Sequence, residues 1–192
     1  MSDPSAFDWC ATSAEAQLAH IRSLAPERRK AALCFYDWAH HPETVLGWAM
    51  AQKGIDLGIA VQVFFNGGPQ RFNYLPKPQV PEAYRGTTRV LDTICQRINS
   101  GFYLVYPTLA PTCRKEALTW LSYQRADQAE GRSGRWVLDE TILDPILSET
   151  RRPAATPETR KARNHSLLRD LMSPVIGLGV DRDILKYRDK TD

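Results

Sequence analysis

The densest set of ionisable side chains lies in one short segment that contains Cys34, Asp37, His40, His41 and Glu43. If a helix continues through this segment, Asp37, His40 and His41 lie on one of its faces, because they are three and four residues apart. A carboxylate beside an imidazole is typical of general acid–base catalysis and of metal ligation. These three residues are therefore the candidate catalytic residues of a small enzyme or metal site.

The same histidines also have a structural interpretation. They stand immediately before Pro42, a residue that fits the first position of a following helix. At the C-terminus of the preceding helix, an imidazolium is favoured by the negative end of the helix dipole. No second segment supplies Glu or His at matching ligand spacing, so the structural interpretation is favoured and no metal is predicted.

No cofactor is predicted either. Gly177-Leu178-Gly179 lacks the third glycine of a dinucleotide-binding fingerprint, and no phosphate loop with Lys-Ser or Lys-Thr occurs. The four cysteines lie far apart in the sequence, which favours reduced thiols in a cytoplasmic protein. Cys113 is the best thiolate candidate, because Arg114, Lys115 and the start of a predicted helix would all lower its pKa.

Two further groups of residues could bind a partner. Aromatic residues and arginine are favoured in the centres of protein interfaces, although a domain of this size must also bury most of its aromatics. The candidate protein-binding residues are Trp38, Trp48, Arg71, Phe72 and Tyr74. A late basic segment supplies candidate nucleic-acid contacts at Arg160, Lys161, Arg163 and Arg169.

The nucleic-acid interpretation is the weaker one. The net charge is only +3, and Asp170, Asp181 and Asp183 follow the basic residues closely. A surface that tracks phosphates needs a broad positive field rather than a local one. The basic segment is therefore interpreted first as a solvated helix face.

Apolar spacing, caps and helix breakers predict an all-α fold, with at most one minor strand pair. Helix starts are expected at Thr12 (a capping box with Glu15), Pro26, Pro42, Asp56 and Thr112. The core is expected to include Leu33, Leu46, Val63, Ile94 and Leu118. Residues 102–106 fit either a short strand or a buried helical turn.

The predicted organisation is a compact multi-helix core domain over residues 1–148, a linker over 149–158 and a basic helical extension over 159–192. Pro153 and Pro157 mark the linker. The N-terminus lacks the pattern of a signal peptide, and Asp56 and Gln62 interrupt the most apolar run, so no membrane association is expected.

Residues about 41–72 resemble the bacterial domain-of-unknown-function 4274 family. The likeness rests on the helix around Val45-Leu46-Gly47-Trp48 and on Asp56-Leu57-Gly58-Ile59-Ala60, where Ile55 and Ile59 replace the usual Cys and Thr. It implies that Asp56 is a cap and that Gly58 and Ala60 allow a neighbouring helix to approach closely. It implies no catalytic activity.

Taken together, the sequence favours a non-catalytic cytoplasmic module that binds another protein, such as a bacterial regulator or an immunity-like inhibitor. An enzyme or metal site at Asp37, His40 and His41 is the first alternative, and a nucleic-acid binder that uses the late basic segment is the second.

Overall fold

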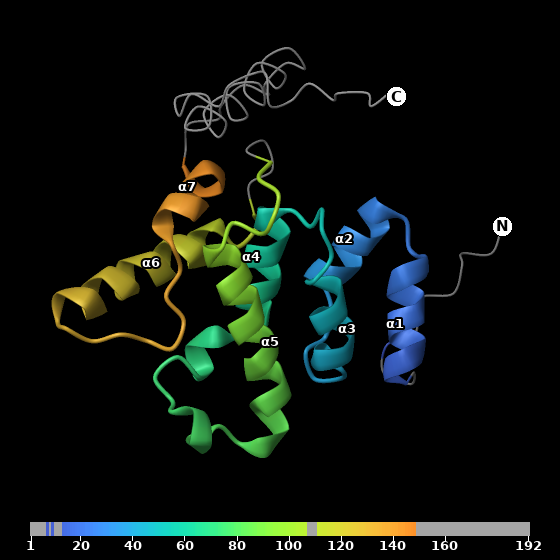
Figure 1. Cartoon of the computed structure of the whole chain (residues 1–192), viewed down its shortest axis with the longest axis horizontal. Helices are drawn as coiled ribbons and strands as arrows, with labels where there is room; N and C mark the ends of the chain where they lie inside the picture. Colours follow the sequence, from blue (N-terminus) through green and yellow to red (C-terminus); the bar gives the residue numbers. More distant parts are fainter. Residues whose placement is uncertain (1–6, 8, 10–12, 107–110, 149–192) are drawn as a thin grey trace, which may run out of the picture. The chain divides into compact units, whose positions relative to one another are not determined.

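The fold is helical throughout the part of the chain that the computed structural model describes, namely residues 7, 9, 13–106 and 111–148 (Figure 1). The α-helices are α1 (Ala14–Ser23), α2 (Pro26–Cys34), α3 (Pro42–Ala49), α4 (Leu57–Asn66), α5 (Glu82–Asn99), α6 (Arg114–Ala129) and α7 (Glu140–Leu147). Two 3₁₀ turns, η1 (Pro69–Arg71) and η2 (Lys77–Gln79), lie between α4 and α5. No strand forms within the described residues, which confirms the all-α prediction.

Local signals in the sequence set most helix starts. Pro26 and Pro42 occupy first helical positions, as predicted. The carboxylate of Asp56 caps α4, where Oδ1 accepts a hydrogen bond from the backbone N–H of Ile59 at 3.2 Å. The first helix begins later than expected, because Ser13 is its cap and accepts from the backbone N–H of Ala16. The predicted capping residue Thr12 lies outside the described residues.

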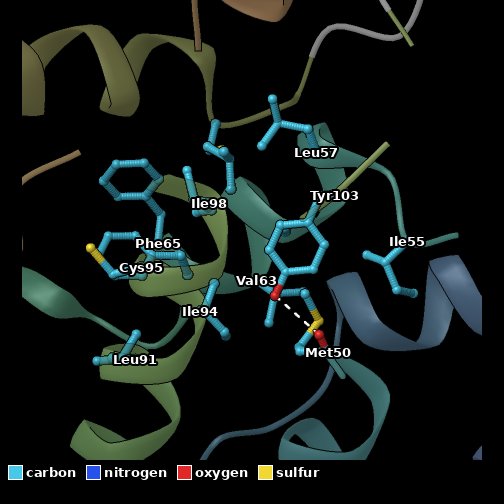
Figure 2. Close-up of a cluster of buried hydrophobic side chains, with 14 of the residues drawn as sticks. Met50, Ile55, Leu57, Val63, Phe65, Leu91, Ile94, Cys95, Ile98 and Tyr103 are labelled. Carbon is cyan, nitrogen blue, oxygen red and sulfur yellow. Dashed lines mark hydrogen bonds between the residues drawn. The ribbon is translucent and has the colours of Figure 1, made fainter. Parts of the chain in front are cut away.

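Helix α4 is the centre of the core. Seven of its ten residues are buried, and it contacts α2, α5, α6 and α7. Figure 2 shows Val63 and Phe65 of α4 among side chains of α5 such as Leu91 and Ile94. Each large apolar side chain that is buried in this way stabilises the fold by roughly 1.5–3 kcal/mol. Packing around α4 is therefore the main source of stability.

The segment that fitted either a strand or a helical turn forms neither. Residues 102–106 form no regular element: the backbone bends at Tyr103, and Leu104 makes one parallel bridge with Asp56. The backbone N–H of Leu104 donates to the carbonyl of Ile55 at 2.9 Å, and the N–H of Leu57 donates to the carbonyl of Leu104 at 2.7 Å. The adjacent Tyr103 is buried, and its hydroxyl donates to the carbonyl of Met50 (Figure 2). The segment thus makes its hydrogen bonds to the start of α4 and the end of α3 rather than within an element of its own.

The prediction of core residues is correct except at Leu118. Leu33, Leu46, Val63 and Ile94 are fully buried, whereas Leu118 is 41 % exposed. Helix α6 directs Ala117 and Leu121 into the core. Leu118 is one residue after Ala117, so it is rotated by about 100° around the helix, out of the core-facing stripe.

The predicted linker and the basic extension lie outside the described residues, and that division of the chain stays a prediction. Among the helices described, none combines the length and the apolar character that crossing a membrane requires.

Candidate functional site

The helix that would bring Asp37 and His41 onto one face does not form. Helix α2 ends at Cys34, and His41 takes the cap position before α3. Asp37 instead stabilises the turn between the two helices: Oδ1 accepts from the backbone N–H of Ala39 at 2.9 Å, and Oδ2 lies 3.4 Å from Nε2 of His40. The expectation that both histidines end a helix is therefore wrong, because they lie in the following turn.

No metal centre is indicated by the geometry of residues 7, 9, 13–106 and 111–148, where no three His, Cys, Asp or Glu side chains come together as ligands. Near α1, the His20 ring stacks on Phe7 with a centroid distance of 3.9 Å. The imidazole of His20 is therefore packed against an aromatic ring.

Cys113 is not an activated thiol. It lies at the start of α6, as expected, but its side chain is buried. Burial, assisted by the charge of Glu116, raises the pKa of the Cys113 thiol to about 12. Desolvation therefore outweighs the helix dipole and the flanking basic residues, which were the basis of the prediction.

The five predicted protein-binding residues do not form one surface. Phe72 is only 5 % exposed and belongs to the core. Trp38 packs so closely against Gly67 that a Cβ atom there would lie 2.8 Å from its ring. The ring of Trp48 is partly covered by the guanidinium of Arg22, at 4.8 Å from the ring centroid.

Arg71 and Tyr74 are more accessible. The guanidinium of Arg71 lies 5.1 Å from the centroid of the Tyr84 ring, so the Arg71 side chain packs against α5. Tyr74 is 65 % exposed and lines a cleft. Of the five predicted residues, Tyr74 is the one that belongs to this concave site.

We call this site the α6 cleft. It has a volume of about 500 Å³ and is mainly apolar. Its walls are Gln70, Asn73 and Tyr74, one face of α6, and part of the loop that leads from α6 to α7, namely Arg132, Ser133, Gly134, Trp136 and Val137. The face of α6 contributes Trp120, Tyr123, Gln124, Asp127 and Gln128.

These α6 residues share a face because they recur at helical spacing, three, four, seven and eight residues after Trp120. From Trp120 to Gln128 the stripe is about 12 Å long at 1.5 Å per residue. Tyr123 is 66 % exposed, whereas Trp120 is partly buried against Phe64 and Phe65. The α6 wall of the cleft is therefore elongated, with two aromatic side chains near its N-terminal end, and Trp120 anchors it in the core.

The loop opposite α6 is fixed by a polar network around Asp92 of α5. Arg135 donates to both carboxylate oxygens of Asp92, at 2.9 and 2.7 Å, and the indole N–H of Trp136 donates to the same carboxylate at 2.8 Å. Asn73 holds the loop from the other side, because its Oδ1 accepts from the backbone N–H of Trp136 and its carbonyl from that of Arg135. Trp136 is thereby held in a buried position at the cleft.

A second clamp joins the loop to α6. The side-chain amide of Gln124 donates to the carbonyl of Leu138 at 2.9 Å and accepts from the N–H of Leu138 at 2.8 Å. One side chain thus satisfies both backbone groups of a residue just before α7. Together with the Asp92 network, it makes the cleft pre-formed rather than dependent on a ligand to order it.

The charges inside the cleft neutralise each other. Asp127 is 8 % exposed and accepts a hydrogen bond from the hydroxyl of Tyr74, a contact that raises the pKa of Tyr74. The other carboxylate oxygen lies 3.5 Å from the guanidinium of Arg132. Asp127 is therefore occupied as a hydrogen-bond acceptor and as an ion-pair partner.

Comparison of the chain with family models, with curated proteins and with solved structures finds no match. The resemblance of residues 41–72 to the domain-of-unknown-function 4274 family therefore stays a prediction.

Proposed function

We propose that this protein is a non-catalytic module that binds a segment of another protein in the α6 cleft. The observation that carries the proposal is a pre-formed, mainly apolar cleft lined by Tyr74, Trp120, Tyr123 and Trp136. Tyrosine and tryptophan contribute large contact areas with few rotatable bonds, and they dominate the energetics of protein interfaces. A volume of about 500 Å³ is within the usual range for pockets that enclose a small ligand.

Binding is favoured over catalysis by the state of the polar groups in the cleft. A general base needs a carboxylate or imidazole that can reach a substrate proton. Asp127 is the carboxylate that lines this cleft, and Tyr74 and Arg132 engage both of its oxygens. The remaining polar lining consists mainly of amides and hydroxyls, which orient ligands but do not exchange protons near neutral pH.

The alternatives have less support. Asp37 and His40 contact each other in a turn, as described above, so the first alternative would need both to leave their present contacts. The basic residues of the nucleic-acid alternative lie outside the described part of the chain. The free thiols at Cys34, Cys95 and Cys113 agree with a reducing compartment, so we place the function in the cytoplasm, as a regulator or an immunity-like inhibitor.

The test is selection from a random peptide library displayed on phage, with the full chain immobilised. Peptides that bind the unaltered chain are retested against Tyr123→Ala, which truncates an exposed cleft residue, and against Phe35→Ala. Phe35 is 89 % exposed and does not line the α6 cleft, so it is the matched control. We expect the Tyr123 variant to lose the selected peptides and the Phe35 variant to retain them. Equal retention by both variants, or an empty selection, would overturn the proposal.

A further inference from the structure

The α6 cleft also restricts the kind of segment that it can bind, and the following inference rests on the proposed function. A charged ligand would need an opposite charge inside the cleft that is not already paired. The two charged residues of the lining, Asp127 and Arg132, form an ion pair, and the same guanidinium also contacts Glu130. The electrostatics of the cleft therefore favour an uncharged ligand.

The hydrogen-bonding groups that remain are few. Both polar atoms of the Gln124 amide are bound to Leu138, and the indole N–H of Trp136 is bound to Asp92. The exposed lining residues Gln70, Tyr123 and Gln128 have no hydrogen-bond partner for their side chains among the described residues. A ligand that enters a mainly apolar cleft loses its water, and every polar group left unpaired costs binding free energy. The ligand must therefore bring little polar surface for its apolar area.

An ordinary extended peptide satisfies this condition poorly, because each residue brings both an N–H and a carbonyl. A proline brings no N–H, so only its carbonyl needs a partner. Amide and phenol groups such as those of Gln70, Gln128 and Tyr123 can donate to such carbonyls. The compact, apolar proline ring also packs well against aromatic side chains, which is how aromatic grooves recognise proline-rich segments.

The length of the site agrees with this ligand. The face of α6 that lines the cleft, from Trp120 to Gln128, is about 12 Å long at the α-helical rise. A polyproline II helix rises about 3.1 Å per residue, so roughly four residues would follow the stripe.

From these contacts we infer that the partner segment is an uncharged, proline-rich peptide in the polyproline II conformation. It lies along α6, its proline rings pack on Tyr123, Trp120 and Tyr74, and its carbonyls accept from the exposed side chains at the rim. Polyproline II segments are already extended before binding, so little conformational entropy is lost.

Titration of the full chain into fluorescein-labelled decaproline, followed by fluorescence anisotropy, tests this inference. We expect saturable binding, and Tyr123→Ala should weaken it by roughly tenfold, the effect of removing one anchoring side chain. Gln128→Glu is a second cleft variant on the exposed surface of α6; it replaces a donor by a carboxylate that repels peptide carbonyls, and should weaken binding several-fold. Phe35→Ala should leave the affinity unchanged.

A labelled glycine–serine peptide of equal length, and a separate titration of the full chain with maltohexaose followed by isothermal calorimetry, complete the experiment. Absence of decaproline binding would overturn the inference. If decaproline did not bind but library peptides without proline bound in a Tyr123-dependent way, the proposed protein-binding function would hold and the inference of a proline-rich ligand would be wrong. If maltohexaose bound in a Tyr123-dependent way and no peptide did, both proposals would fail. Equal weakening by the Tyr123 and Phe35 variants would show that decaproline binds outside the cleft.

Discussion

The core around α4 and the α6 cleft are held together by different kinds of contact. In the core, buried apolar side chains of neighbouring helices pack on α4 with few polar partners. At the cleft, aromatic side chains are positioned by hydrogen bonds that a loop without secondary structure donates to Asn73, Asp92 and Gln124. Apolar packing tolerates small adjustments of side-chain position. A buried polar network does not, because a group that loses its hydrogen-bond partner destabilises the fold. The shape of the cleft therefore depends on a few polar contacts, whereas the core depends on buried apolar area.

The largest expected effect comes from a charge in the core. Val63 is fully buried on α4, so Val63→Asp should prevent folding, because an unpaired buried carboxylate costs several kcal/mol. Leu118→Asp is the matched control: Leu118 is 41 % exposed on α6, and its replacement should leave the fold intact. Far-ultraviolet circular dichroism measures the helix content of both variants, and urea unfolding measures their free energy of unfolding. A folded Val63 variant would show that the packing around α4 is not the main source of stability.

A smaller effect is expected when the cleft network is cut at Asp92. Asp92→Ala removes the partner of Arg135, whose side chain is only 11 % exposed, and of the Trp136 indole. Breaking a fully buried ion pair costs 3–5 kcal/mol, and Asp92 is a third exposed, so we expect a loss of about 2–3 kcal/mol with the helices retained. Peptide binding in the cleft should weaken as well, since the loop loses its anchor.

The control for this change is another arginine–carboxylate contact near the same loop. Arg125 of α6 pairs with Glu140 of α7, but the Arg125 side chain is 64 % exposed. Arg125→Ala should lower the free energy of unfolding by much less than Asp92→Ala does, because solvent screens exposed pairs. Denaturant midpoints of the two variants give the comparison. Equal losses would mean that the Asp92 network contributes no more than a surface ion pair.

The two regions also differ in how far the sequence predicted them. The α4 region was predictable because its signals are local: Asp56 caps the helix, Val63 and its neighbours repeat at helical spacing, and Gly68 adopts the left-handed conformation that stops it. The cleft depends on contacts between distant residues, such as Tyr74 with Asp127 and Asp92 with Arg135. No periodicity in one sequence records such pairs.

Several residues of the site were missed or misjudged in the predictions from sequence. Trp120, Tyr123 and Trp136 were not predicted as site residues, although Trp120, Tyr123 and Asp127 share a helical spacing that could have marked a face of α6. Trp38 and Phe72 were chosen for their side-chain type, but type alone does not distinguish a buried aromatic from an exposed one. Cys113 was misjudged for a related reason, since its burial could not be seen from its basic neighbours.

The smallest expected effect concerns Asp56, the carboxylate buried beside the core. Its Oδ1 caps α4, whereas Oδ2 is buried without a hydrogen-bond partner. Desolvation raises the pKa of Asp56 above its ordinary value of 3.8, so the folded protein binds a proton more tightly than the unfolded chain does. As pH rises through the window between these two pKa values, the unfolded state is favoured and the free energy of unfolding falls.

Asp56→Ala removes the cap and should cost roughly 0.5–2 kcal/mol, but Asp56→Asn keeps a capping oxygen without the buried charge and should cost less. Urea unfolding at several pH values gives the free energy of unfolding of the unaltered chain and of both variants. Both variants should lose the part of the pH dependence that comes from Asp56. If the Asn variant were as unstable as the Ala variant, the cap would depend on the negative charge, and the desolvation argument for this carboxylate would be wrong.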